Sequence, residues 1–175
     1  RLSSWKGQID FLNVLKLLKT NNFICYFIGD DNNNSYYKRL ISKIKKNNLQ
    51  NCCKVLGSFS KEEMRLMYYC ADIIISAPTK PEGFGRVISE GLAMKKIVLS
   101  YNYGGAADQL FGLDDVYIVK PLDHNEMAEK IKNVFQISNS TLNNLGEIGR
   151  KHVIKNFSTE TMIKKYYSFY QDNIL

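Results

Sequence analysis

Two glutamates eight positions apart, Glu82 and Glu90, bracket a short glycine-containing stretch in the segment PEGFGRVISEGLA. Gly83 and Gly85 permit backbone conformations that other residues resist, and they leave backbone N–H groups open to a ligand. A helix that begins near Phe84 or Gly85 has unpaired amides in its first turn and a dipole that favours an anion there. The segment can therefore bind a negatively charged group between two carboxylates.

The spacing of the two acids fits a ligand with hydroxyl groups on both sides of a diphosphate. Glu90 lies one and a half turns into such a helix, roughly 7–8 Å along its axis, and Glu82 precedes the first turn. Carboxylates accept hydrogen bonds from paired hydroxyls but repel phosphate, so both acids must stay clear of the anion. A nucleotide sugar, with a hydroxylated ring at each end of its pyrophosphate, has this order of groups.

Alternating strand and helix patterns place this segment just after the carboxyl end of a strand. Short apolar runs predict strands at 23–29, 53–57, 72–76, 97–101 and 116–120. Helical spacing and capping signals predict helices at 8–20, at 36–47, from Ser60 to near Cys70, after Gly85, from Asp123, and over 141–174 with breaks near Gly146–Gly149 and Phe157–Ser158. This alternation predicts an α/β fold, a Rossmann-like parallel sheet with helices on both faces. Ligands of such sheets bind beyond the carboxyl ends of the strands, which selects the loops at 29–35, 57–60, 77–85 and 102–106.

Length and composition indicate a single globular domain. The chain has 175 residues, of which 45% are apolar and 23% charged. No stretch approaches the roughly 20 apolar residues that a membrane helix needs, and no secretory signal is apparent. Because the chain opens on RLSSWKGQ without an initiator Met, we expect it to be a fragment whose start has been removed.

The charged and metal-ligating residues favour neither nucleic acid nor a metal. The net charge of +7 comes from lysines scattered along the chain, without an arginine-rich strip or an RNA-binding signature. It leaves a phosphorylated ligand or an anionic membrane surface as the expected anionic partner. The four cysteines lack C-x-x-C spacing and only two histidines are present, so no metal site is expected. The DDNNN run at 30–34 lacks the glycine and the final glutamate of a calcium loop and is interpreted as a turn.

The E-x7-E arrangement, followed by G-L-A-M, resembles the donor-site signature of the retaining glycosyltransferases of family 4 (glycosyl transferases group 1). Further segments follow in the order of that family: RLSSWKG at 1–7, FIGD at 27–30, VLG at 55–57, ADIIIS at 71–76, GG at 104–105 and FS at 157–158. The resemblance implies that 1–175 is one nucleotide-sugar-binding domain, half of a GT-B architecture, whose amino-terminal acceptor domain is absent. It also implies that the helix at 158–175 crosses to that missing domain.

The resemblance assigns roles to particular residues. Its implied catalytic residues are Glu82, Lys6 and Arg1, and its implied substrate-binding residues are Gly83, Phe84, Gly85, Val87 and Glu90. Lys6 and Arg1 match the basic pair that grips the donor pyrophosphate and stabilises its growing charge as the sugar leaves, in place of a metal. Glu82 matches the residue beside the transferred sugar, and Glu90 matches the ribose-binding glutamate.

The same resemblance implies a metal-independent transferase without a cofactor beyond its nucleotide-sugar donor. The W-K-G-Q and E-G-F-G-R runs are most similar to members that build bacterial cell-envelope polysaccharide or lipopolysaccharide. A glycan or lipid-linked acceptor would bind through the missing domain of a cytoplasmic enzyme, with peripheral association at the inner membrane face left open. The sequence departs from the family at Gly104–Asp108, where G-G-x-P-E is common, and in the DDNNNS loop, which replaces a compact G-D-G-P.

Alternative interpretations remain at this point. A sugar-nucleotide epimerase or phosphorylase half would share the twin-domain plan, and a basic α/β binding module would need no enzymatic site. We expect the chain alone to bind nucleotide weakly and to catalyse no transfer. His152 is interpreted as a surface or capping side chain, and the cluster Tyr166, Tyr167, Phe169 and Tyr170 as packing residues that promote self-association if the other half is absent.

Overall fold

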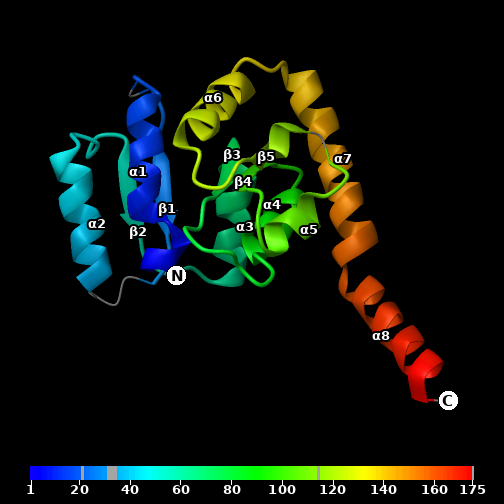
Figure 1. Cartoon of the computed structure of the whole chain (residues 1–175). Coiled ribbons are helices and arrows are strands. Elements are labelled where there is room, and N and C mark those ends of the chain that lie inside the picture. Colours follow the sequence, from blue (N-terminus) through cyan, green and yellow to red (C-terminus); the bar gives the residue numbers. More distant parts are fainter. Residues whose placement is uncertain (21, 31–34, 114, 175) are drawn as a thin grey trace.

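The computed structural model describes residues 1–20, 22–30, 35–113 and 115–174. Its elements are η1 (Ser4–Lys6), α1 (Gln8–Leu17), β1 (Cys25–Ile28), α2 (Ser35–Lys46), β2 (Cys53–Leu56), α3 (Lys61–Cys70), β3 (Ile73–Ser76), α4 (Arg86–Ala93), β4 (Ile97–Tyr101), α5 (Gly105–Leu110), η2 (Asp115–Tyr117), β5 (Ile118–Val119), α6 (His124–Val134), α7 (Asn139–Phe157) and α8 (Thr159–Ile174) (Figure 1). Most of the loop at 29–35, including the DDNNN turn beyond its first residue, lies outside the described residues.

All the described strand pairs are parallel, which confirms the predicted α/β class. Strands β1 and β2 form a two-stranded sheet, and β3, β4 and β5 form a three-stranded sheet in that order. The described strands therefore make two sheets instead of one continuous sheet. Cys25 lies opposite Cys53 in the first sheet, and Ile73 lies opposite Ile97 in the second. The connections between paired strands contain helices, the usual form of the crossover that parallel strands need.

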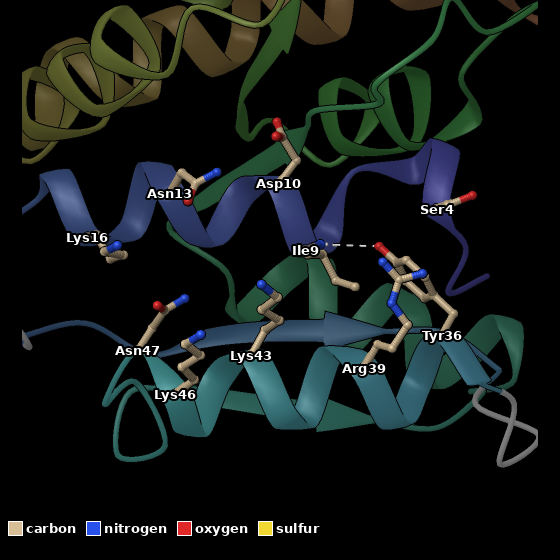
Figure 2. A pocket seen from close by; sticks show the side chains of 10 residues that line it. All are labelled: Ser4, Ile9, Asp10, Asn13, Lys16, Tyr36, Arg39, Lys43, Lys46 and Asn47. Carbon is tan, nitrogen blue, oxygen red and sulfur yellow. Dashed lines mark hydrogen bonds between the residues drawn. The ribbon is translucent and has the colours of Figure 1, made fainter.

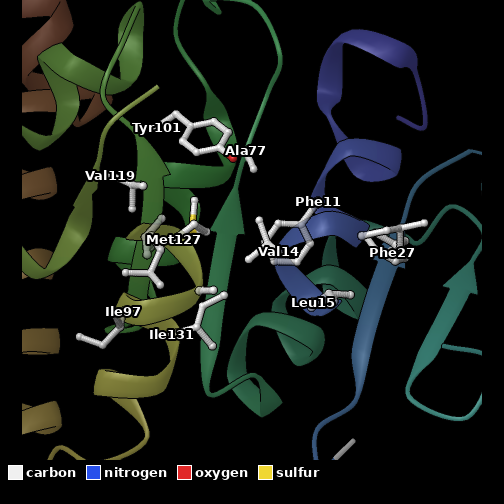
Figure 3. Packing of buried hydrophobic residues seen from close by; sticks show 14 of the residues in the cluster. Phe11, Val14, Leu15, Phe27, Ala77, Ile97, Tyr101, Val119, Met127 and Ile131 are labelled. Carbon is white, nitrogen blue, oxygen red and sulfur yellow. The ribbon is translucent and has the colours of Figure 1, made fainter. Parts of the chain in front are cut away.

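One apolar core joins the two sheets. Every residue of β4 is buried, as expected for the central strand of its sheet. Apolar residues of α1, including Phe11 and Val14, belong to the same buried cluster as Phe27 of β1 and Leu99 of β4. Figure 3 shows the α1 side chains together with those of β1, β4 and α6. The loops at the strand ends are therefore carried by a single packed unit.

The carboxyl-terminal helices differ from the prediction at one of two expected breaks. The break at Phe157–Ser158 is confirmed, because Ser158 is extended and its Oγ accepts a hydrogen bond from Thr161 N at 3.2 Å. The break at Gly146–Gly149 is wrong, because α7 continues through both glycines. A Cβ at Gly146 would overlap the carbonyl oxygen of Lys95, and one at Gly149 would lie 2.9 Å from Leu92 Cδ2. These glycines therefore allow α7 to approach the end of α4 closely.

The last helix projects from the body of the domain (Figure 1). Six of its apolar or aromatic side chains are between 50% and 65% exposed: Met162, Ile163, Tyr166, Tyr167, Phe169 and Tyr170. The interpretation of the cluster Tyr166, Tyr167, Phe169 and Tyr170 as packing residues is therefore wrong for this structure, because these side chains are exposed. Among the described helices, none combines the length and the apolar character needed to cross a bilayer.

Candidate functional site

The candidate site forms where η1 meets the loop that follows β3. Thr79 N donates to the carbonyl of Trp5 at 2.8 Å, and Thr79 Oγ1 donates to the carbonyl of Ser4 at 3.3 Å. Gly7 ends η1 with a φ of 78°, and a Cβ at this position would overlap the carbonyl oxygen of Ala77. A residue with a side chain would therefore push η1 away from the loop. The glycine lets the first segment of the chain dock beside the EGFG turn.

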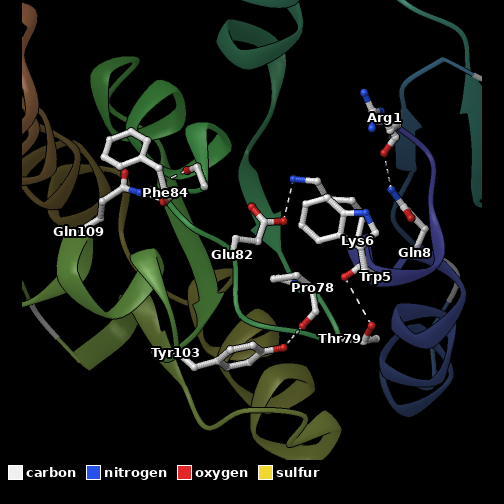
Figure 4. Close-up of polar contacts among 11 residues, drawn as sticks. Arg1, Trp5, Lys6, Gln8, Pro78, Thr79, Glu82, Phe84, Tyr103 and Gln109 are labelled. Carbon is white, nitrogen blue, oxygen red and sulfur yellow. Dashed lines mark hydrogen bonds and ion pairs between the residues drawn. The ribbon is translucent and has the colours of Figure 1, made fainter.

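This docking brings Lys6 into contact with Glu82 (Figure 4). The Lys6 Nζ lies 2.6 Å from Glu82 Oε1, and the two side chains are 28% and 9% exposed. The same ammonium lies 4.5 Å from the centre of the Trp5 ring, a cation–π distance. Two predicted site residues that are far apart in the sequence thus form one ion pair. A largely buried carboxylate requires such a partner.

The Gly104–Gly105 turn holds the backbone of Glu82 in place. Glu82 and Gly104 form an isolated parallel bridge, and Gly105 N donates to the Glu82 carbonyl at 2.8 Å. A Cβ at Gly105 would lie 2.7 Å from Phe84 Cα, so the turn fits tightly against the EGFG segment. The sequence of this turn departs from the family, but its structural role is clear: it fixes the position of the Glu82 backbone.

Helix α4 begins where the sequence predicts and presents an open amino-terminal end. Gly85 is its N-cap, with a φ of 82° and no side-chain cap. Ile88 N donates to the carbonyl of Gly85 at 2.9 Å, whereas the backbone amides of Arg86 and Val87 donate to no protein group among the described residues. Unpaired first-turn amides together with the helix dipole make this end suited to an anion.

The ring of Phe84 packs against another part of the chain, and its backbone carbonyl is hydrogen-bonded. The ring is 43% exposed and lies edge-on to Phe157 at 6.0 Å between centroids. Its carbonyl accepts a hydrogen bond from Gln109 Nε2, and Gln109 is fully buried. The carbonyl of Gln109, in the last turn of α5, in turn contacts His152 Nε2 at 2.8 Å, so His152 is half-buried and has the predicted capping role, at the carboxyl end of α5. Nothing in the local sequence of Gln109 indicates this role, because it depends on the packing of α5 and α7 against the loop.

Glu90 lies one and a half turns into α4 and has two polar partners. Tyr68 OH donates to Glu90 Oε2 at 2.8 Å, and an Arg86 guanidinium nitrogen lies 2.7 Å from Oε1. Burial, and after it the negative charge of Glu90, raises the pKa of the Tyr68 hydroxyl well above its ordinary value, so it remains a donor. The Arg86 pair could have been found from its i, i+4 spacing. The Tyr68 contact could not, because it comes from α3.

Arg1 lies at the other side of the site, next to the end of β1. An ideal Cβ at Gly29 would lie 2.9 Å from Arg1 N, and Gln8 Nε2 donates to the Arg1 carbonyl at 3.1 Å. Arg1 is exposed, and Figure 4 shows its side chain beyond Lys6, on the side away from Phe84. The structure thus brings Lys6, Glu82 and the start of α4 together and places Arg1 at the edge of this group.

No cluster of three or more His, Cys, Asp or Glu side chains that could hold a metal ion occurs in the described ranges. Lys6 and Arg1 are the cations at this site, and the open amides of α4 are groups suited to an anion. Glu82 and Glu90 flank those amides, at the N-terminal side and one and a half turns in. This arrangement can neutralise a diphosphate and offer hydrogen-bond acceptors to hydroxyls on both sides of it.

Known proteins resemble this chain in sequence and in structure. Residues 1–152 match the family model described as glycosyl transferases group 1. The crystal structure of a glycosyltransferase from Rickettsia africae is 34% identical, with a TM-score of 0.88 over 98% of this chain and 45% of that chain. HepE from Anabaena, crystallised with UDP, is 24% identical, with a TM-score of 0.86 over 98% of this chain and 47% of that chain.

A curated relative is similar over nearly the same range. The lipopolysaccharide 1,2-N-acetylglucosaminetransferase of Salmonella typhimurium is 23% identical over 95% of this chain and 45% of its own length. The chain thus spans less than half of each of these proteins. The likeness to the solved glycosyltransferases confirms the predicted fold class, a parallel α/β unit of the GT-B type.

Proposed function

The chain belongs to the glycosyl transferases group 1 family, and from this membership we propose that it is the donor-binding half of a retaining, metal-independent glycosyltransferase. The observation that carries the proposal is the Lys6–Glu82 ion pair beside the open amino-terminal end of α4. A cation and two free amides there face the place where a diphosphate would lie. Glu90 is positioned further along the same helix for the nucleoside.

The donor is expected to bind with its diphosphate against the amides of Arg86 and Val87. Glu90 accepts one hydrogen bond at each oxygen from protein partners. A carboxylate has about four lone-pair sites, so it retains acceptor capacity for the two ribose hydroxyls. Tyr68 holds the carboxylate in one orientation, which makes it a positioning residue in this proposal. On the other side, Glu82 accepts hydrogen bonds from the transferred sugar.

Transfer is proposed to occur by same-face substitution at the anomeric carbon. The bond between that carbon and the diphosphate oxygen breaks, and a new bond to the acceptor oxygen forms on the same face. The acceptor proton passes to the leaving diphosphate. Lys6, with Arg1, stabilises the negative charge that grows on the diphosphate, and Glu82 lies beside the cationic sugar ring.

The acceptor is proposed to bind to a second domain outside these 175 residues. The relatives are about twice as long as the chain, and α8 leaves an apolar face exposed that an adjoining domain would cover. The similarity to a lipopolysaccharide 1,2-N-acetylglucosaminetransferase supports a cell-envelope glycan as the acceptor. The chain by itself is expected to bind the donor without transferring sugar.

Calorimetric titration with UDP, GDP and their sugars tests the donor proposal. We expect at least one of them to bind the folded chain, and Glu90→Ala to weaken that binding about 10- to 100-fold because hydrogen bonds to a charged group are lost. Glu129→Ala, which removes an exposed acid from α6, is the matched control and should leave the affinity unchanged. Absence of binding by every ligand to a folded sample would overturn the proposal.

Tyr68→Phe is expected to lower the affinity for UDP about threefold to tenfold, the effect of losing one hydrogen bond to a carboxylate. The ring and its packing remain, so the free energy of unfolding should change little. Tyr69→Phe is the natural control, because Tyr69 is the adjacent residue and is 70% exposed. Equal UDP affinity of Tyr68→Phe and the wild type in the same titration would show that Tyr68 does not position Glu90.

A further inference from the structure

A second cationic site lies on the opposite side of α1 from the core of the second sheet. The groove between α1 and α2 has a volume of about 400 Å³ and is lined by ten residues: Ser4, Ile9, Asp10, Asn13, Lys16, Tyr36, Arg39, Lys43, Lys46 and Asn47. Figure 2 shows Arg39, Lys43 and Lys46 rising from α2 toward α1. None of the residues proposed to contact the donor lines this groove, and the residue that the two regions share is Ser4, whose carbonyl helps to dock η1.

The four cations of the groove have no carboxylate partner among the described residues. In the part of the chain that the structure describes, Lys16, Arg39, Lys43 and Lys46 form no ion pair with a carboxylate. The one acidic lining residue, Asp10, instead contacts His124 Nε2 at 2.7 Å, and in Figure 2 its carboxylate is turned away from α2. All four side chains are exposed, so water and salt screen their mutual repulsion, and an anion bound between them would lower it further.

Helix dipoles do not explain this arrangement fully. Lys16 and the lysines at 43 and 46 lie in the last turns of α1 and α2, where a cation stabilises the helix. Arg39 lies in the second turn of α2, outside the last turn in which the dipole favours a cation, and α2 has no acidic residue in its first turn. Its guanidinium lines the same groove as the three lysines. A planar fork of donors among ammonium groups is suited to the oxygens of a phosphate.

The groove also has neutral donors on both walls. Asn13 and Asn47 line it with side-chain amides, and Tyr36 holds its hydroxyl at the end nearest η1. That hydroxyl accepts from Ile9 N at 3.2 Å and donates its one proton to Gln8 Oε1 at 3.1 Å, so Tyr36 bounds the groove without offering it a free donor. We infer that the α1–α2 groove is a binding site for a phosphate group, separate from the donor site. The phosphate could belong to the headgroup of an anionic phospholipid or to a free phosphate compound.

The test compares two double variants of the same helix in the whole chain. Arg39→Gln with Lys43→Gln removes two cations from the groove, and Lys38→Gln with Lys45→Gln removes two exposed cations that do not line it. Each protein is sedimented with vesicles of phosphatidylglycerol and phosphatidylcholine, and with phosphatidylcholine alone. Each is also titrated calorimetrically with inorganic pyrophosphate after UDP has been added to saturation.

The site is supported if, in either arm, the affinity of the groove variant falls about 30-fold, which corresponds to about 1 kcal/mol for each cation removed. The affinity of the control variant should fall less than about threefold in the same arm. Loss in the vesicle arm identifies a lipid headgroup as the source of the phosphate, and loss in the pyrophosphate arm alone identifies a free compound. Absence of binding in both arms, or equal losses by the two variants, overturns the inference. The comparison between variants does not depend on UDP binding, so it stays informative if the donor proposal fails.

Discussion

Lys6→Ala is expected to lower kcat/KM of the full-length enzyme about 100- to 1,000-fold, the range found when one preorganised charge-stabilising group is removed. Lys6 is the cation in direct contact with Glu82, and in the proposed complex it neutralises the leaving diphosphate. The loss should appear mainly in kcat, because the charge on the diphosphate is largest in the transition state. Steady-state kinetics with a fixed acceptor measures it.

Two further variants separate charge stabilisation from a folding defect. Lys6→Ala leaves the largely buried Glu82 carboxylate without its partner, which by itself lowers stability by about 1–3 kcal/mol. Lys6→Arg keeps the positive charge and should restore part of kcat, whereas Lys151→Ala removes an exposed lysine of α7 and should change nothing. Activity of Lys6→Ala within threefold of the wild type would remove Lys6 from the mechanism.

Gly7→Ala is expected to lower the free energy of unfolding by about 3 kcal/mol, from strain at a positive φ and from overpacking. The φ of Gly7 is 78°, and an added Cβ would overlap the carbonyl oxygen of Ala77. Relief of this contact would displace η1 from the loop at 77–79, so the affinity for UDP should fall as well. Urea unfolding and calorimetry of the same preparation measure the two effects.

Gly112 offers a control matched in backbone conformation. Its φ is 84°, but an added Cβ would have no heavy atom within 4 Å. Gly112→Ala should therefore lower the free energy of unfolding by about 1 kcal/mol, the contribution of strain at a positive φ without overpacking. If Gly7→Ala and Gly112→Ala lower the free energy of unfolding equally, the close packing of η1 against the loop after β3 does not exist in solution.

Elements governed by local interactions could be predicted from the sequence. The strand at 97–101 agrees residue for residue with β4, because a short apolar run preceded by two lysines has few alternatives. The capping box at Ser60 and Glu63 also forms as predicted, since both of its hydrogen bonds join residues three apart. Helix α5 was missed, because the turn at Gly104 and Gly105 is a stronger sequence signal than the six residues that follow.

Contacts between distant elements could not be predicted in the same way. The family resemblance placed Lys6 and Glu82 at one ligand, but their direct ion pair depends on how Gly7 docks η1 against the loop after β3. Tyr68 reaches Glu90 from a different helix and has no motif of its own. At Gly146 and Gly149 the sequence predicted a break that α7 does not have. Glycine weakens an isolated helix, but here it is required for close packing against other elements.

The position of the diphosphate in a crystal of the chain with UDP tests the central claim most directly. The diphosphate should lie within hydrogen-bond distance of the Arg86 and Val87 amides, with Lys6 beside it and both ribose hydroxyls on Glu90. UDP bound elsewhere, or bound here with Glu90 contacting only Tyr68 and Arg86, would contradict the proposed donor site.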